Sequence, residues 1–416
     1  DLAKIYGRFE AKERDVSSVV KEIIEDVKKN KNKALFKYTK KFDNADYDRK
    51  SVLVSKEEIK KALKRVKKSD LALLEEIAGR IRKFHQKQLK NSWFTNDEPG
   101  IVLGQMVNPL NRVGLYVPGG KAAYPSSVIM NAIPAKIAGV NEVIMVCPTP
   151  NGHLNDIIVA AAVISGVDKV FKVGGAQAVA ALAYGTASIP KVDKIVGPGN
   201  MYVAEAKRML YGVVDIDMVA GPSEILIISD GTKDPAYAAA DMLSQAEHDE
   251  MACSYLVTHD EKHAKAVIAE LKKQLKKLKR SKIALKSLED HGAVIITKSL
   301  KESIDIANKI ASEHLELAVN EPFSILSEIK NAGAIFMGAE TPEAIGDYAA
   351  GPNHVLPTGG TARFYSPLSV DDFIKRSSII YYTKDALKDM GESAARMADL
   401  EGLTAHANAV RIRLKK

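Results

Sequence analysis

The sequence feature that most constrains the fold is an alternation of short apolar runs, glycine-rich turns and alanine-rich helical stretches between residues 112 and 230. Strand-like runs separated by helices of this length predict right-handed crossovers and a parallel sheet. The expected strands in this region lie within residues 112–120, 142–147, 168–173 and 194–196. A second series begins at 224–230 and continues through 293–297, a helix over 301–312, and strands at 315–319 and 333–336. We therefore predict an α/β protein with two α/β units.

Helices are predicted on either side of this region. Residues 14–90 carry apolar residues at helical spacing, and a polar break follows at residues 91–100. The tail is expected to be helical over 384–399 and again over 402–414. With 416 residues, the chain is too long for one ordinary domain, and two or three are expected.

The composition excludes several classes of protein. No apolar run is long enough to span a bilayer, and the mean hydropathy is −0.12. The N-terminus shows no signal-peptide pattern, and it begins at Asp1 without a methionine. The two cysteines, Cys147 and Cys253, are too few for a disulfide framework and indicate a reducing cytoplasm. Both lie in apolar runs, which favours buried small side chains over nucleophiles.

A net charge of +8 raises the question of nucleic-acid binding. The excess concentrates in residues 271–280, where Leu271, Leu275 and Leu278 share one helical face. This spacing predicts an amphipathic helix with a solvated basic face. A nucleic-acid surface is the less favoured alternative, because aromatic residues do not interleave with the lysines.

Glycine-rich turns follow three of the expected strands, at residues 118–120, 174–175 and 197–199. Ligands of open parallel sheets bind at the carboxyl ends of strands, and glycine lets the backbone approach an anion there. These turns indicate a phosphate-bearing cofactor. However, neither a Gly-x-Gly-x-x-Gly fingerprint nor a Walker loop is present, so tight turns of an ordinary α/β fold are almost as good an explanation.

Polar residues in four segments could form a metal or catalytic site. Gln245 and His248 are three residues apart in a predicted helix and therefore share one face, as half of a tetrahedral metal site would require. Such pairs also occur by chance. The adjacent Glu313 and His314 lie at a helix-to-strand junction, where a carboxylate and an imidazole could activate water and shuttle protons. A solvent-facing pair is equally consistent with that position.

The remaining candidates lie further along the chain. The run 351–363 is rich in turn residues, yet it carries His354 and follows Asp347 by four positions. Functional residues are often held on such loops. His406 lies in the C-terminal segment.

Seven motifs, taken in order, resemble the histidinol dehydrogenase family. They are Arg112–Gly120, Val173–Leu182, Val192–Asn200, Ala220–Glu224, Leu243–His248, Ser312–Leu315 and Gly351–Thr358. The resemblance covers essentially the whole chain. It implies a zinc-dependent, NAD-linked oxidoreductase of histidine biosynthesis that converts L-histidinol through L-histidinal to L-histidine.

The resemblance also assigns residues. It implies one zinc ion per subunit held by Gln245, His248, Asp347 and His406, and a catalytic pair of Glu313 and His314. The implied NAD contacts are Tyr116, Gln177 and Asn200. The implied substrate contacts are Ser223, Gln245, His248, His314, Asp347, Glu401 and His406. No residue at these positions departs from the family pattern.

The implied architecture is that of two incomplete Rossmann-like domains, similar to aldehyde dehydrogenases, with small terminal pieces. Residues 1–12 would form an N-terminal arm, residues 13–115 and 225–368 a first α/β domain, and residues 116–224 a second. Residues 369–416 would form a helical segment that reaches the active site of the partner in a homodimer. Neither a nucleic acid nor a membrane is expected as a partner.

The implied chemistry suits these side chains. The substrate carries an imidazole and an amine, both good zinc ligands, so the metal would mainly orient it. His314 would remove the hydroxyl proton, and Glu313 would deprotonate the water that attacks the aldehyde. A zinc hydrolase and a cysteine-dependent aldehyde dehydrogenase are the alternatives. Oxidation of histidinol by NAD distinguishes the first, and serine substitutions of the two cysteines distinguish the second.

Overall fold

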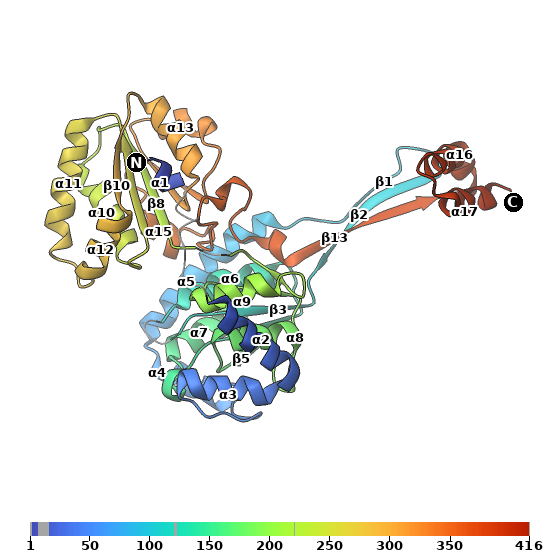
Figure 1. The fold of residues 1–416 in the computed structure, drawn as a ribbon, viewed down its shortest axis with the longest axis horizontal. Coiled ribbons are helices and arrows are strands. Elements are labelled where there is room, and N and C mark those ends of the chain that lie inside the picture. Colours follow the sequence, from blue (N-terminus) through green and yellow to red (C-terminus); the bar gives the residue numbers. More distant parts are fainter. Residues whose placement is uncertain (1, 7–15, 120–122, 220, 416) are drawn as a thin grey trace. The chain divides into compact units, whose positions relative to one another are not determined.

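The computed structural model describes residues 2–6, 16–119, 123–219 and 221–415. The chain divides into two compact units, one made of residues 1–88 and 110–373 and the other of residues 89–109 and 374–416. Each unit is described separately (Figure 1). Most of the expected N-terminal arm, residues 1 and 7–12, lies outside the described residues.

The larger unit contains two parallel sheets, in agreement with the two predicted α/β units, and each sheet has five strands. The first sheet has the order β5-β4-β3-β6-β7, and the second has the order β10-β9-β8-β11-β12. The strands of the first sheet are β3 (Arg112–Tyr116), β4 (Glu142–Val146), β5 (Lys169–Phe171), β6 (Lys194–Val196) and β7 (Asp215–Ile216). Those of the second are β8 (Glu224–Ser229), β9 (Cys253–Thr258), β10 (Ala293–Ile296), β11 (His314–Ala318) and β12 (Ala334–Met337).

Helices cover both faces of the first sheet, and successive strand residues face opposite sides. Ile144 and Val146 pack with α2 (Ser17–Asn30), α3 (Asn32–Asp43), α8 (Gly175–Tyr184) and α9 (Met201–Leu210). Val143 and Met145 pack on the other side with α4 (Lys56–Arg65), α5 (Lys68–His85), α6 (Pro125–Ile137) and α7 (Asp156–Ser165). Burial on both faces explains why these strands are continuously apolar in sequence.

This packing groups the N-terminal helices differently from the domain boundaries drawn from the sequence. Helices α2–α5 bury their apolar faces against the sheet of residues 112–216, whereas residues 13–115 were expected to join residues 225–368. Helical periodicity predicts that one face is buried but carries no information about which sheet covers it.

The second sheet is covered in the same way. One face packs with α10 (Pro235–Ala246), α11 (Glu261–Leu275) and α12 (Ser281–His291), and the other with α13 (Leu300–Ile310) and the short α1 (Leu2–Tyr6). The predicted basic helix over residues 271–280 is corrected, since α11 ends at Leu275. Leu271, Leu275 and Leu278 still pack on one cluster, as their spacing predicted.

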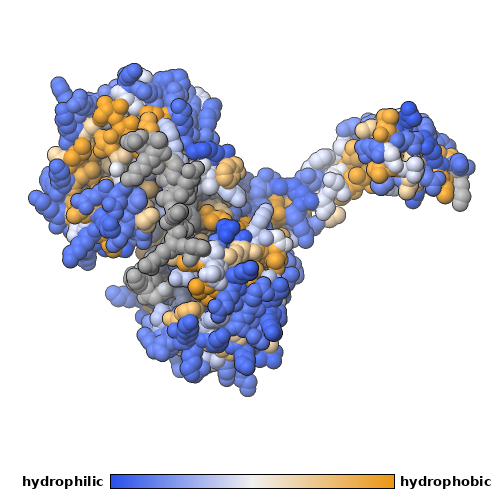
Figure 2. Space-filling model, viewed as in Figure 1, coloured by the Kyte–Doolittle hydropathy of each residue, from blue (hydrophilic) through white to orange (hydrophobic). Residues whose placement is uncertain are grey.

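The smaller unit is a three-stranded antiparallel sheet with two helices. Its strands are β1 (Trp93–Thr95), β2 (Ile101–Pro109) and β13 (Ile374–Tyr382), and its helices are α16 (Lys384–Leu400) and α17 (Thr404–Leu414). The two helices confirm the prediction for the tail, whereas none of the strands was assigned from the sequence. Figure 2 shows hydrophobic residues on the surface of this unit.

In the described part of the chain, no helix is both long enough and apolar enough to cross a membrane.

Candidate active site

His314 lies at the centre of a buried cluster of carboxylates. It is the first residue of β11, beside the first residues of β8, and it lies on the amino edge of the second sheet. Its Nε2 atom is 3.4 Å from Asp347 Oδ1, and its Nδ1 atom is 3.5 Å from Glu343 Oε1 and 3.7 Å from Glu313 Oε2. Asp347 and Glu343 are four residues apart on α15 (Glu343–Tyr348), so both face the imidazole.

The backbone of β8 fixes the orientation of this pair. His314 Nδ1–H donates to the carbonyl oxygen of Glu224 at 2.9 Å, while the Glu224 N–H donates to Glu313 Oε2, also at 2.9 Å. Because Nδ1 carries the proton in that bond, Nε2 is the basic nitrogen of the neutral imidazole. His314 Nε2 and Glu343 Oε2 are buried and have no hydrogen-bond partner among the described residues.

Burial and mutual charge shift the proton affinities of the cluster. Burial raises the pKa of Glu313 to about 8 and that of Glu343 to about 7. Burial alone would lower the pKa of His314, but the surrounding carboxylates outweigh it and raise the pKa to about 10. Burial would also raise the pKa of Asp347, yet the neighbouring His314, His354 and His248 hold it below its ordinary value. Perturbed groups gathered in this way are typical of functional sites.

Two of the expected metal ligands of the larger unit come from the last turn of α10 and from the turn that follows it. Gln245 lies at the end of α10 and is fully buried. Its acceptor neighbours set the orientation of its side-chain amide. The amide nitrogen donates to Glu343 Oε1 at 3.1 Å and to the Glu224 carbonyl at 3.2 Å. This orientation turns its carbonyl oxygen away from those acceptors. His248 is exposed, and its Nδ1–H donates to the Ser244 carbonyl at 2.9 Å, which leaves Nε2 available as a ligand.

A second set of three donors also lies within metal-binding reach. His314, Glu343 and Asp347 place one ligand atom each within 4.8 Å of one another. Nδ1 of His314 is engaged by the Glu224 carbonyl, so Nε2, 3.4 Å from Asp347 Oδ1, is the nitrogen of this set that remains without a hydrogen bond among the described residues. The unpartnered buried atoms and the mixed nitrogen and oxygen donors fit a zinc ion at Asp347.

Sequence reasoning missed Glu343 and the main-chain carbonyl of Glu224, and it noted His354 without a role. His354 Nδ1–H donates to the Asp347 carbonyl at 3.0 Å. Ser223, an expected substrate contact, directly precedes Glu224 at this edge. The remaining expected residues, Glu401 and His406, are exposed and belong to the smaller unit.

The expected cofactor residues lie on adjoining elements of the first sheet. Tyr116 ends β3, and its hydroxyl oxygen accepts the N–H of Gly175 at 3.0 Å. Gln177 lies in the first turn of α8, and its Oε1 atom is buried without a partner among the described residues. Asn200 precedes α9 and caps it by accepting the N–H groups of Tyr202 and Val203.

Cys147 is poorly suited to nucleophilic catalysis. Burial raises the pKa of its thiol to about 12, so it remains protonated at neutral pH. This supports the expectation that both cysteines are buried, reduced side chains.

The comparisons with known proteins agree with this geometry. The family model for histidinol dehydrogenase matches residues 7–414. The chain belongs to the histidinol dehydrogenase family. Histidinol dehydrogenases of Geobacter metallireducens and Clostridium acetobutylicum are 56% and 53% identical to it, over 100% and 96% of this chain and 95% and 93% of their own lengths.

Solved structures confirm the fold of this histidinol dehydrogenase family member. The crystal structure of histidinol dehydrogenase from Elizabethkingia anophelis matches with a TM-score of 0.93 and 39% identity, covering 97% of this chain and 93% of that one. An acetylating aldehyde dehydrogenase from Geobacillus thermoglucosidasius matches with a TM-score of 0.50 and 15% identity, over 89% of this chain and 99% of that one. The second likeness concerns the fold alone and confirms the aldehyde-dehydrogenase-like architecture.

Proposed function

We propose that this protein is a cytoplasmic, zinc-dependent and NAD-linked histidinol dehydrogenase. It oxidises L-histidinol through L-histidinal to L-histidine, the last step of histidine biosynthesis. The observation that carries the proposal is the buried His314, whose basic Nε2 has no hydrogen-bond partner among the described residues, in a chain of this family.

Gln245, His248 and Asp347 are the proposed zinc ligands from one subunit, and His406 of a second subunit completes the set. The support is the convergence of Gln245 and Asp347 on the His314 cluster, together with the free Nε2 of His248. When bound, zinc supplies a template that orients the imidazole and amine of the substrate. Ser223 and Glu401, with the ligands and His314, complete the substrate contacts.

His314 acts as the base of the first oxidation. Its Nε2 accepts the hydroxyl proton of L-histidinol while the carbon-bound hydrogen leaves as hydride to NAD⁺. The Glu224 carbonyl holds the required tautomer through Nδ1–H. Glu313, Glu343 and Asp347 together raise the pKa of His314, and a metal cation held by Asp347 would oppose this by favouring the neutral imidazole.

Glu313 serves the second oxidation. Its carboxylate takes a proton from the water that adds to the L-histidinal carbonyl, and the hydrate then gives hydride to a second NAD⁺. The Glu224 N–H holds one carboxylate oxygen in place beside the imidazole. Burial, which raises its pKa, makes the carboxylate a stronger base than an exposed one.

Tyr116, Gln177 and Asn200 are the proposed contacts of NAD. The support is their gathering at the carboxyl ends of the paired strands β3 and β6 and in the first turn of α8. Main-chain N–H groups at a helix N-terminus favour a pyrophosphate. The buried, unpartnered Oε1 of Gln177 offers an acceptor to the cofactor.

A homodimer is part of the proposal, because the smaller unit cannot bury a core of its own. Its only buried apolar side chains among the described residues are Ile101, Ala386, Ala395 and Ala407. Its exposed large apolar side chains are Leu89, Trp93, Phe94, Leu103, Met106, Ile380, Tyr381, Met390, Met397, Leu400, Leu403 and Ile412. A unit of this size needs more buried surface to fold, and a second copy of the chain is the proposed cover.

The test is NADH formation from L-histidinol and NAD⁺. Two NADH per L-histidinol, with L-histidine as the product, are expected. One NADH per substrate would limit the reaction to the alcohol step, and turnover that requires no NAD⁺ would favour a zinc hydrolase instead.

A further inference from the structure

We infer that the buried ion pair between Lys207 and Asp217 positions the backbone of the proposed NAD site. The pair binds both the main-chain N–H and the main-chain carbonyl of Gly197. The inference rests on the proposed NAD contacts. Lys207 lies on α9, and Asp217 follows β7. Their side chains are 3% and 2% exposed, and Lys207 Nζ donates to Asp217 Oδ1.

The pair reaches the backbone of the turn from two sides. The Gly197 N–H donates to Asp217 Oδ2 at 2.7 Å, and Lys207 Nζ donates to the Gly197 carbonyl at 3.0 Å. Asp217 Oδ1 also accepts the N–H of Met218 at 2.7 Å. Charge-assisted hydrogen bonds of this kind are stronger than neutral ones and fix geometry.

Gly197 needs such support because its backbone is unusual. Its φ is +111°, and a Cβ atom at this position would lie 2.1 Å from the carbonyl oxygen of Tyr116. Gly197 therefore lies directly against the end of β3. The turn that it starts leads to Asn200, and the Tyr116 hydroxyl oxygen accepts the N–H of Gly175, the first residue of α8. One chain of contacts thus links the ion pair to the three elements that carry the NAD contacts.

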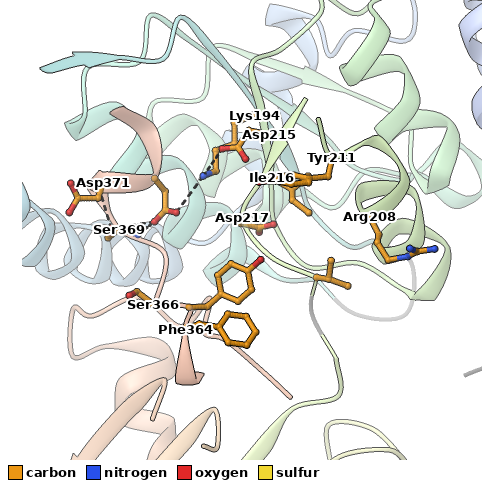
Figure 3. Close-up of a pocket in the computed structure, with 13 residues that line it drawn as sticks. Lys194, Arg208, Tyr211, Asp215, Ile216, Asp217, Phe364, Ser366, Ser369 and Asp371 are labelled. Carbon is orange, nitrogen blue, oxygen red and sulfur yellow. Dashed lines mark hydrogen bonds and ion pairs between the residues drawn. The ribbon is translucent and has the colours of Figure 1, made fainter. Parts of the chain in front are cut away.

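Asp217 also lines a pocket, but its carboxylate oxygens are not available to a ligand there. It lines an open pocket of about 480 Å³ together with Lys194, Arg208, Tyr211 and Phe364 (Figure 3). Both of its carboxylate oxygens are nevertheless engaged by Lys207, Gly197 and Met218. The carboxylate therefore acts on the turn and not on a ligand in the pocket.

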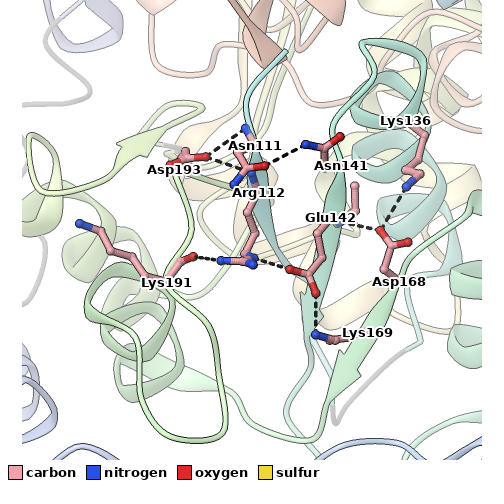
Figure 4. A network of polar contacts seen from close by, with 10 residues as sticks. Asn111, Arg112, Lys136, Asn141, Glu142, Asp168, Lys169, Lys191 and Asp193 are labelled. Atoms are coloured by element: carbon pink, nitrogen blue, oxygen red, sulfur yellow. Dashed lines mark hydrogen bonds and ion pairs between the residues drawn. The ribbon is translucent and has the colours of Figure 1, made fainter. Parts of the chain in front are cut away.

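The opposite end of the same sheet provides a matched control. Glu142, at the start of β4, accepts from Arg112 and forms an ion pair with Lys169 at 2.6 Å (Figure 4). Its side chain is 19% exposed, and its contacts lie at the amino ends of the strands. Glu142→Gln weakens a polar network of the sheet without touching the turns that carry the NAD contacts.

The experiment compares Lys207→Met, the double variant Lys207→Met/Asp217→Leu, and Glu142→Gln in the zinc-loaded enzyme. Lys207→Met leaves a buried carboxylate uncompensated, whereas the double variant removes both charges and is expected to fold. NAD⁺ binding is measured by calorimetry, and amide hydrogen exchange is followed in the peptide that contains residues 197–203. Zinc content and thermal unfolding report on the rest of the fold.

We expect the double variant to recover stability relative to Lys207→Met but to bind NAD⁺ roughly ten- to a hundredfold more weakly than wild type, with faster exchange at residues 197–203. Zinc content stays unchanged, and Glu142→Gln binds NAD⁺ as wild type does. A double variant with wild-type affinity and exchange would overturn the inference alone. Wild-type protein that binds no NAD⁺ would overturn the proposed function, and the inference with it.

Discussion

At the scale of single residues, the site depends on how His314 shares its environment with three carboxylates. One imidazole nitrogen is committed to the Glu224 carbonyl, and the other faces Asp347. The carboxylates favour the protonated imidazole, which would make it a poor base without a cation nearby. In the proposed mechanism, a metal cation beside these carboxylates would therefore favour the neutral form of His314 that can act as a base.

Removing one ligand should empty the metal site. His248→Ala deletes an imidazole that uses Nδ1 locally and leaves Nε2 free, so bound zinc and turnover are both expected to fall to near background. His259→Ala, an exposed histidine after β9, is the control and should keep both. Metal content by atomic absorption checks the result; full zinc and full turnover in His248→Ala would refute the assignment.

Glu313 should matter more to the second oxidation than to the first. Glu313→Gln keeps an oxygen that can accept the Glu224 N–H but loses the basic carboxylate. Single-turnover NADH formation should therefore slow about 10²- to 10⁴-fold from L-histidinal and much less from L-histidinol. Equal losses in the two halves would argue against a water-activating role.

The part of the site that was predictable consists of side chains in recognisable motifs. Gln245 and His248 were found by an expected helical spacing, although α10 ends at Ala246 and His248 lies in the turn that follows. Glu313 and His314 were found because they are adjacent. Glu343 was missed, although its spacing of four from Asp347 is a usable helical signal. The Glu224 carbonyl leaves no trace in the sequence, because any residue supplies a carbonyl and only strand pairing places it.

At the scale of elements, the candidate site residues lie at opposite ends of the strands in the two sheets. The glycine-rich turns follow the carboxyl ends of β3 and β6, as the general rule for parallel sheets predicts. The His314 cluster lies instead at the amino ends of β8 and β11, where α10 returns to the sheet and brings Gln245. A rule based on carboxyl ends alone would therefore not locate the His314 cluster.

Two glycines should respond to alanine with opposite signs. Gly197→Ala combines a positive φ with a contact of 2.1 Å to the Tyr116 carbonyl, and should lower the free energy of unfolding by at least about 2 kcal/mol. Gly79 lies on the exposed face of α5 with no atom within 4 Å of an added Cβ, so Gly79→Ala should raise the free energy of unfolding by about 0.5–1 kcal/mol. Denaturant unfolding followed by circular dichroism measures both. A Gly197→Ala variant as stable as wild type would contradict the close approach.

The strands that sequence reasoning found are the buried ones. Strands such as β4 and β8 are continuously apolar because helices cover both faces. Strands β2 and β13 pair over nine residues, yet most of their side chains are exposed or half-buried. Without a buried face they show no period of two, so the apolar pattern could not reveal them.

At the scale of the whole molecule, the proposed homodimer rests on the composition and burial of the smaller unit. This unit carries His406 and Glu401 on exposed positions, and its exposed apolar surface calls for a partner. The sequence pattern predicted the two helices of this unit. The shared site was expected only from the family resemblance, because local spacing carries no information about a second copy of the chain.

Mixed subunits test the shared site. Neither His406→Ala nor Gln245→Ala should be active alone. After equal subunits are unfolded and refolded together, about a quarter of wild-type activity should return, because half of the dimers are mixed and each of these has one intact site. Steady-state NADH formation measures it. No rescue would place His406 in the site of its own subunit.

The central claim, that zinc and NAD act together on histidinol at the His314 cluster, is tested most directly by NADH formation from L-histidinol before and after treatment with a chelator. The zinc-free protein should remain folded by circular dichroism, lose turnover, and regain it when Zn²⁺ is added. Undiminished turnover in protein shown to be free of metal would contradict it.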